Sequence, residues 1–188
     1  AGSTRSTVVF FTNFGTAYSC RLVDVPASTG YGEPIQRLFK FRDGERVLTA
    51  LSLDPRAIGI IAPPADGEPA PAHAVAVTSD GYSLRFNLDG FVEPSTRAGR
   101  RYARPVEGVE VVGVQAITGS ETMIAVTRDA RALLCRVDEV NLLAGPGKGV
   151  ILIKIDPADD RVLGFLASRG DRDLMTVETS RGALQTVS

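Results

Sequence analysis

The chain has 188 residues, of which 44% are hydrophobic and 23% are charged, and its net charge is −1. It is long enough for one domain, or two small ones, with a buried core, and its composition is that of an ordinary globular protein. The balanced charge excludes a general electrostatic attraction to nucleic acids or anionic membranes. No apolar run reaches the roughly 18 to 20 residues that span a membrane.

The cysteines and the N-terminal residues indicate the cellular compartment of the protein. Cys20 and Cys135 are the only cysteines, so a disulfide scaffold is not indicated. The first residues lack the basic and apolar regions of a secretion signal. We therefore expect a cytoplasmic protein with reduced cysteines.

The first predicted element is a β-hairpin at residues 9–25. An apolar strand ends at Thr12, a short polar turn closes with Gly15, and a second strand alternates apolar and polar residues. Similar stretches follow at 76–91, 125–140 and, in shortened form, 176–187. In these the threonine and the turn residue recur as Thr78 and Gly81, Thr127 and Ala130, and Thr179 and Gly182. Such self-similarity predicts a repeat architecture.

The second strands of the hairpins place equivalent side chains on the same face. Because side chains alternate along a strand, Tyr18, Cys20 and Leu22 lie on one face. Their equivalents are Leu84, Phe86 and Leu88 in the next hairpin and Leu133, Cys135 and Val137 in the third. We expect these faces to point inward. Arg21, Arg85 and Arg136 then fall on the opposite, outward face.

The second half of each unit also repeats. A Gly/Arg-rich loop (STGYG, TRAGRR or GPGKG) leads into a strand, and a turn then leads to a closing strand at 45–53, 109–117 or 160–168. Four strands in about 50 residues match the dimensions of a propeller blade. We predict an all-β, propeller-like fold, with residues 55–72 forming a Pro/Ala-rich insertion loop. The predicted units are three complete ones at 7–54, 73–120 and 121–168, and a partial fourth at 171–188.

The loop GPGKG at 145–149 invites comparison with nucleotide-binding loops. That motif needs a glycine five positions before its Gly-Lys pair, a Ser or Thr after the pair, and then a helix. The corresponding positions here are Leu142 and Gly149, and a strand pattern follows. Nucleotide binding is therefore not expected, and the glycines fit turn geometry.

No set of residues in the sequence forms a catalytic or metal-binding signature. His73 is the only histidine, the carboxylates are scattered over turns, and no Ser/His/Asp set with a supporting motif is present. Cys20 and Cys135 occupy equivalent inward positions, where Phe86 stands in the other unit, and this favours a role in the core.

The repeats resemble the C-terminal domain of the A subunit of bacterial type IIA topoisomerases, the DNA gyrases and topoisomerases IV. The resemblance is carried by VTSDGYSLRF, VTRDARALLCRVDEV, GPGKGVILIKI and DDRVLGFLA, which follow the order of the family repeat. It implies a β-pinwheel, a propeller-like disc whose blades exchange strands with their neighbours. It also implies that the domain binds duplex DNA around its outer edge and bends it.

Gyrases of this family carry a box reading Gln-Arg-Arg-Gly-Gly-Lys-Gly in the first blade. The nearest stretch here is 143–149, which keeps Gly145, Gly147, Lys148 and Gly149 but lacks the glutamine and both arginines. This departure favours a topoisomerase IV-like protein, or a gyrase that wraps DNA weakly or has its box elsewhere.

The resemblance also implies which residues contact DNA. The densest basic run, at 96–105, contains four arginines and no acid, and arginine suits bidentate contacts to phosphate. Tyr102, within this run, is expected to pack in the core. The candidate DNA contacts are Arg97, Arg100, Arg101, Arg104, Lys148, Arg21, Arg85, Arg136 and Lys154.

The family's catalytic tyrosine belongs to an N-terminal breakage-reunion region whose motifs are absent here, so we expect no activity from this chain alone. No cofactor is expected in it, while ATP and magnesium serve the rest of the holoenzyme. The implied partners are duplex DNA, the breakage-reunion region and the ATPase B subunit, in a nucleoid-associated cytoplasmic complex. The alternatives are a β-propeller that binds only proteins and, less well supported, an enzyme with a site in a propeller channel.

Overall fold

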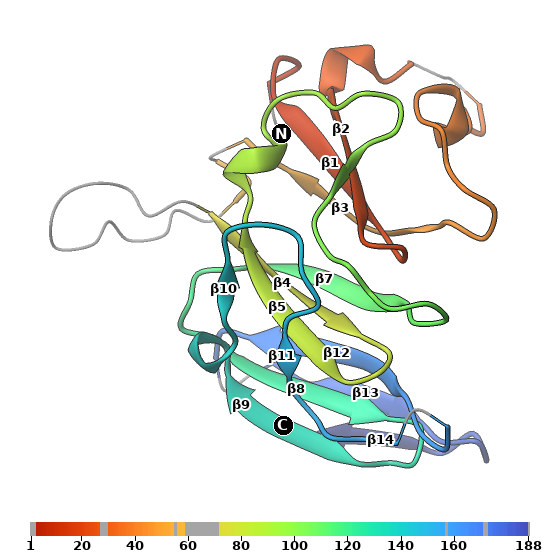
Figure 1. Cartoon of the computed structure of the whole chain (residues 1–188), viewed down its shortest axis with the longest axis vertical. Helices are drawn as coiled ribbons and strands as arrows, with labels where there is room; N and C mark the ends of the chain where they lie inside the picture. The colour runs from red at the N-terminus through yellow and green to blue at the C-terminus, as the bar shows by residue number, and fades with distance from the viewer. Residues whose placement is uncertain are drawn as a thin grey trace, which may run out of the picture.

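The computed structural model describes residues 3–26, 30–54, 56–58, 72–156, 158–170 and 173–187. Within these ranges the chain forms fourteen β-strands and four short 3₁₀ turns, so the predicted all-β class is confirmed. The first three sheets follow one another along the long axis of the molecule in chain order, and the hairpin of β13 and β14 lies at the level of the third sheet (Figure 1). The predicted insertion loop at 55–72 lies outside the described residues, except for 56–58 and 72.

The first sheet contains the hairpin of the first unit and its closing strand. Strands β1 (Thr7–Thr12), β2 (Thr16–Arg21) and β3 (Val47–Ser52) are antiparallel, with β1 in the middle. A fourth strand, β6 (Arg100–Arg101), pairs with β2 and comes from the second unit. The first unit is therefore completed by its successor in the chain.

The second sheet repeats this arrangement. Strands β4 (His73–Thr78), β5 (Tyr82–Asn87) and β7 (Val111–Ile117) are its own, with β4 in the middle. The third unit supplies β10 (Leu142–Leu143) and β11 (Val150–Ile151), and both pair with β5. The exchange of strands between neighbouring units, which the resemblance implied, is thus present at two successive junctions.

The third and fourth sheets have fewer strands among the described residues. Strands β8 (Thr122–Thr127), β9 (Ala132–Arg136) and β12 (Val162–Ser168) form the third sheet, with β8 in the middle. Strands β13 (Met175–Glu178) and β14 (Leu184–Val187) form a two-stranded hairpin. In the described part of the chain no strand pairs with the outer edge of β9.

The closing strands β3, β7 and β12 face one another and hold the sheets together along one side. The hydroxyl of Thr49 on β3 donates to the carbonyl oxygen of Val114 on β7 (3.1 Å). Gln115 on β7 accepts a bond from the amide of Ala167 (2.7 Å) and donates to the carbonyl oxygen of Phe165 (3.4 Å), both on β12. We call this side the hub.

The core lies between successive sheets. One cluster joins Val9 and Phe11 of the first sheet to residues of the second, among them Phe86 and Tyr102. The ring of Phe11 lies 5.0 Å from that of Tyr102 and 5.6 Å from that of Phe86, in the edge and tilted geometries that aromatic rings prefer. A second cluster joins the second and third sheets in the same way. The predicted core role of Tyr102 is confirmed, since this residue is buried.

Two features differ from the prediction. Each second strand gives way to a 3₁₀ turn near its end, at Leu22–Asp24 (η1), Asp89–Phe91 (η3) and Val137–Glu139 (η4). The strand expected after the first Gly-rich loop is absent from residues 30–46, which instead contain the turn η2 (Ile35–Arg37). Phe39 follows this turn and packs with Tyr18 and Val8 on the outer face of the first sheet. In this position residues 35–41 cover the face that a preceding blade covers in the second sheet.

Candidate nucleic-acid interface

The strands taken from the next unit lie at the edge of each sheet that is opposite the hub. In the first sheet the order is β3-β1-β2-β6, so β6 and the hub strand β3 form the two edges. In the second sheet β10 and β11 both pair with the edge of β5 that faces away from the hub strand β7. We call this outer edge the rim and define it as β6, β10, β11 and the loops at 96–104 and 144–154.

Four of the predicted contacts lie together on the rim around β6. Arg101 and Arg104 are exposed. The guanidinium of Arg100 donates to the carbonyl oxygens of Gly90 (2.7 Å) and Glu93 (3.3 Å), which fixes the side chain while its charge stays uncompensated. Among the described residues, none of the four arginines at 97, 100, 101 and 104 forms an ion pair. The result is a concentration of positive charge without acidic partners.

The structure adds basic residues of the first unit to this surface. The amide of Lys40 donates to the carbonyl oxygen of Arg97 (2.8 Å), and the Arg97 guanidinium lies 3.4 Å from the carbonyl oxygen of Arg37. Lys40 is exposed and has no ion-pair partner in the described part of the chain. The signal in the sequence was the run RLFKFR at 37–42, in which basic residues interrupt the inward Leu38, Phe39 and Phe41.

Glycines before the exchanged strands allow a close approach of two backbones. Gly99 precedes β6 with φ +71°, and a side chain there would lie 2.8 Å from the carbonyl oxygen of Ala17. Gly149 precedes β11 with φ +89°, and a side chain there would overlap the carbonyl group of Ser83. The two positions are equivalent in successive units. The last glycine of GPGKG is therefore required by the contact with β5 and by a backbone conformation that favours glycine.

Lys148 and Lys154 occupy different surroundings. The Lys148 ammonium lies 3.5 Å from a carboxylate oxygen of Asp80 and 3.7 Å from the centre of the Tyr82 ring. Its side chain thus turns back to the second sheet. Lys154 is exposed and follows Ile153, whose amide is bound to the carbonyl oxygen of Gly81 (3.1 Å).

Arg21, Arg85 and Arg136 do not join the cluster around β6. Arg21 is exposed at the far end of β2. Arg136 is exposed but pairs with Asp138 (2.8 Å), and this pairing raises the pKa of the guanidinium. The outward position expected for Arg85 is only partly right, because it is half-buried and donates to the carbonyl oxygens of Val140 (2.5 Å) and Asp138 (3.3 Å). Arg85 thus fastens the turn η4 of the third unit to β5.

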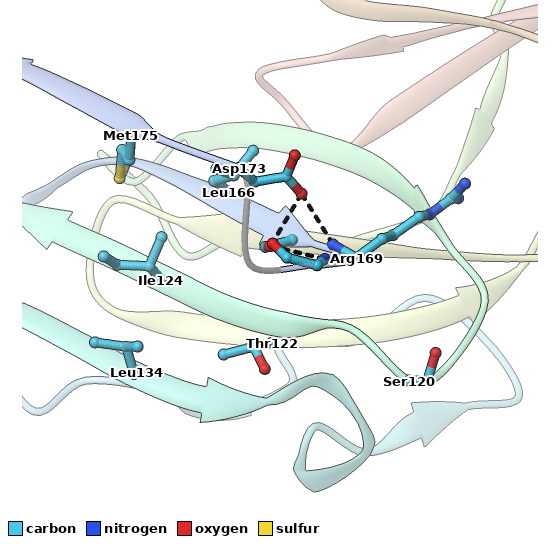
Figure 2. Close-up of a pocket in the computed structure, with 10 residues that line it drawn as sticks. Ser120, Thr122, Ile124, Leu134, Leu166, Arg169, Asp173 and Met175 are labelled. Carbon is cyan, nitrogen blue, oxygen red and sulfur yellow. Dashed lines mark hydrogen bonds between the residues drawn. The ribbon is translucent and has the colours of Figure 1, made fainter. Parts of the chain in front are cut away.

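A cavity of about 310 Å³ lies away from this surface, between the third sheet and β13 (Figure 2). Ile124, Leu134 and Met175 form its apolar walls. Its acid, Asp173, is engaged within the chain, since it accepts from the hydroxyl of Ser168 (2.9 Å) and the amide of Arg169 (3.0 Å). The arrangement is that of incomplete packing between two blades.

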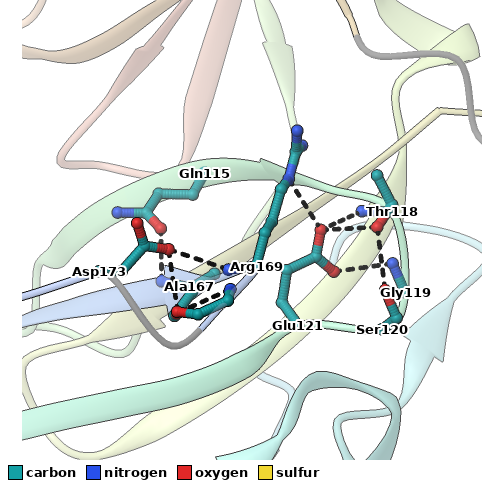
Figure 3. Close-up of polar contacts among 10 residues, drawn as sticks. Gln115, Thr118, Gly119, Ser120, Glu121, Ala167, Arg169 and Asp173 are labelled. Atoms are coloured by element: carbon teal, nitrogen blue, oxygen red, sulfur yellow. Dashed lines mark hydrogen bonds and ion pairs between the residues drawn. The ribbon is translucent and has the colours of Figure 1, made fainter. Parts of the chain in front are cut away.

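Close to this cavity a buried carboxylate organises the start of β8 (Figure 3). Glu121 accepts hydrogen bonds from the amide and hydroxyl of Thr118 (2.6 and 2.8 Å), the amide of Gly119 (2.8 Å) and the guanidinium of Arg169 (3.2 Å). Burial raises the pKa of Glu121, but the hydrogen bonds from Thr118 and Gly119 outweigh burial and leave the pKa below its usual value. Glu121 therefore has a structural role.

The cysteines follow the expectation of a core role. Cys20 is buried beside Tyr18, and Cys135 is half-buried against the second core cluster. Burial raises the pKa of both thiols. Among the described residues, no three His, Cys, Asp or Glu side chains are grouped so that they could hold a metal ion. No helix in the described ranges is long and apolar enough to cross a membrane.

The fold and its exchanged strands define a propeller-like repeat domain, and comparison with known proteins specifies the kind. Residues 6–54, 73–118 and 121–169 match the family described as DNA gyrase C-terminal domain, beta-propeller. The chain therefore belongs to the family of DNA gyrase C-terminal domains.

Individual relatives agree with this family. The A subunit of DNA gyrase from Aminobacterium colombiense (strain DSM 12261 / ALA-1) is 29% identical over 163 residues, which are 86% of this chain and 18% of that protein. The chain thus spans about a fifth of the curated relatives it matches. The C-terminal domain of DNA topoisomerase IV has a TM-score of 0.83 at 18% identity, covering 97% of this chain and 53% of that one. The DNA gyrase A C-terminal domain has a TM-score of 0.65 at 18% identity, covering 94% and 52%. At these identities the two structures establish the fold.

Proposed function

We propose that the chain binds duplex DNA along its rim and bends it, as a non-catalytic domain of a type IIA topoisomerase A subunit. The observation that carries the proposal is a cluster of basic residues at the junction of the first two units that has no acidic partner within the described part of the chain. Arg97, Arg100, Arg101 and Arg104 come from the second unit, and Lys40 comes from the first. DNA lying there would contact two blades at once.

The chemistry is electrostatic. Arginine and lysine side chains neutralise phosphates and release condensed counterions, so affinity falls as salt rises. Contacts of this kind fix the position of the duplex without reading its bases, and the cost of bending is offset by the contacts that the bend allows. We expect little dependence on DNA sequence.

The surface is limited in extent, and this supports weak wrapping. The equivalent of β6 in the next unit is β11, where Val150 and Ile151 replace the two arginines. The box-like loop at 143–149 keeps a lysine, but that lysine is already paired with Asp80. In the complete enzyme the domain would present a bent segment to the breakage-reunion region, while the partner B subunit uses ATP for strand passage, in the cytoplasm and on the nucleoid.

Binding of a fluorescent linear duplex, followed by anisotropy over a range of salt concentrations, tests the proposal. We expect binding at low salt and a linear fall of log K with log salt. Replacing Arg101 and Arg104 together with alanine should reduce the slope by about 1.8, at about 0.9 per phosphate contact. Arg161→Ala is the control, because Arg161 adjoins the hub strand β12. If the wild-type chain does not bind at low salt, the DNA proposal is wrong and a protein-binding propeller is favoured.

A further inference from the structure

Lys148 is the basic residue of the box-like loop, and its charge is used inside the protein. Its ammonium lies 3.5 Å from Oδ2 of Asp80 and 3.7 Å from the centre of the Tyr82 ring. The Asp80 side chain is only 6% exposed, and its other oxygen accepts a bond from the hydroxyl of Thr78 (2.5 Å). Lys148 is the one cation paired with Asp80 among the described residues.

The same junction one unit earlier has neither partner. Gly99 and Gly149 occupy equivalent places before the exchanged strands, and Gly15 and Gly81 occupy equivalent places in the hairpin turns. Counting back one residue from each, Ala98 stands where Lys148 stands in the next unit. Phe14 likewise stands where Asp80 stands. The acid and the base are therefore present together at one junction and absent together at the other.

The pairing opposes contact between Lys148 and a phosphate. If the ammonium left for a phosphate, the Asp80 carboxylate would remain buried without a counter-charge, which is strongly unfavourable. The ammonium would also lose the face of the Tyr82 ring. A phosphate must therefore compete with two partners that are already in place.

We propose that Asp80 and Tyr82 withhold the charge of Lys148 from DNA, so that Lys148 fastens the third unit to the second and adds little to DNA binding. The inference rests on the proposed DNA-binding function. Asp80 would thus limit the strength of DNA binding at this part of the rim without touching the DNA itself. Removing Asp80 should release Lys148 for a phosphate contact.

The test compares the DNA affinity and salt dependence of matched variants. Asp80→Asn keeps the shape of the side chain and its hydrogen bond with Thr78 but removes the charge. We expect it to bind a linear duplex several-fold more tightly, with a salt slope steeper by about 0.9, the value for one added phosphate contact. Glu107→Gln is the control, because Glu107 is exposed and the change in net charge is the same.

Three further variants separate release of Lys148 from a general effect of charge or folding. In the Asp80→Asn protein, adding Lys148→Ala should abolish the gain in affinity and slope. Tyr82→Leu leaves the net charge unchanged and should raise affinity in the same direction. By itself, Lys148→Ala should leave DNA affinity within about two-fold of wild type, as expected when no phosphate contact is lost. It should also speed amide hydrogen exchange at Leu152 and Ile153, whose amides donate to the carbonyl oxygen of Gly81.

The outcomes decide between the two proposals. If Asp80→Asn gains no more than Glu107→Gln, or if Lys148→Ala alone lowers the salt slope by about 0.9, the inference is wrong while the DNA-binding function stands. If neither the wild-type chain nor the Asp80→Asn variant binds DNA at low salt, both fail.

Discussion

The carbonyl oxygen of Ala103 lies 2.5 Å from the position that a Cβ atom of Gly15 would occupy. The two residues belong to successive units, and the amides of Tyr102 and Ala103 both donate to the carbonyl oxygen of Gly15 (2.9 and 3.2 Å). In the next pair of units the amides of Leu152 and Ile153 donate in the same way to Gly81 (2.8 and 3.1 Å). The hairpin turn of one unit is thus the seat for the exchanged strand of the next.

Replacing Gly15 or Gly81 with alanine should destabilise the protein. Both residues have positive φ, +74° and +84°, where a side chain costs about 1–2 kcal/mol, and the added methyl group would also collide with the next unit. We expect a loss of at least about 2 kcal/mol in the free energy of unfolding, measured in urea. Gly145→Ala should have little effect, since no atom of the described residues lies within 4 Å of its Cβ position. Equal losses for all three variants would contradict a close contact between the hairpin turn and the exchanged strand of the next unit.

Ala130 offers the opposite experiment. It holds the equivalent turn position in the third unit with φ 59°, and it is exposed, so a side chain is tolerated there at the cost of strain. Ala130→Gly should raise the free energy of unfolding by about 1 kcal/mol. An unchanged or lower stability would show that the methyl group makes a favourable contact that outweighs the strain.

Lys40, which is not among the contacts predicted from the sequence, should contribute to DNA binding. It is exposed next to Arg97 and has no acidic partner among the described residues. We expect Lys40→Ala to lower the salt slope of DNA binding by about 0.9 without changing the unfolding free energy appreciably. The measurement is anisotropy over a salt series, with Arg161→Ala as the control. A slope equal to that of wild type would show that Lys40, the residue of the first unit in the proposed interface, does not contact DNA.

Arg85, which is among the contacts predicted from the sequence, should prove structural. Its guanidinium is bonded to the carbonyl oxygens of Val140 and Asp138 in the third unit. Arg85→Gln should lower the unfolding free energy by about 1.5–3 kcal/mol, the usual value for hydrogen bonds to a charged group, and leave the salt slope unchanged. A shallower slope with unchanged stability would instead assign Arg85 to the DNA surface.

Glu121 should make stability depend on acid. Its pKa in the folded protein lies below its usual value because hydrogen bonds from Thr118 and Gly119 outweigh the effect of burial. The unfolded pKa is about 4.3, so the stabilisation is complete above about pH 5 and is lost as the pH falls through the folded pKa. Urea unfolding between pH 7 and 3 should therefore show a shallower acid loss for Glu121→Gln than for wild type. Parallel curves would exclude a contribution from Glu121.

The hairpins and closing strands could be predicted from the sequence, because their signals are local. Alternation around Tyr18 and Leu84, glycine in the turn and a recurring threonine fix strands that pair with their neighbours in the chain. The exchanged strands could not be predicted from local pattern. Strand β6 has two residues, both arginines, and its partner β2 belongs to the preceding unit. Only the resemblance to a known family supplied the exchange.

The candidate interface was predictable in part for a similar reason. The run at 96–105 stands out by charge alone, and its arginines form no ion pair with any residue that the structure describes. Whether Arg85 and Lys148 are free to contact DNA depends on partners that the fold brings from another unit, Val140 and Asp80. A sequence shows which residues carry charge, but the pairing that neutralises the charge is a property of the folded chain.

Because each sheet borrows its outer strand, the repeat in the sequence and the body in space have different boundaries. A chain cut after residue 120 would contain every residue of the second unit and still leave the outer edge of β5 without β10 and β11. Bare strand edges of this kind join other chains and aggregate. A piece that keeps the second sheet whole must extend at least through Ile153, and one that also keeps β8 paired must continue through β12. The ends of a stable shortened form are therefore set by strand pairing and not by the repeat in the sequence.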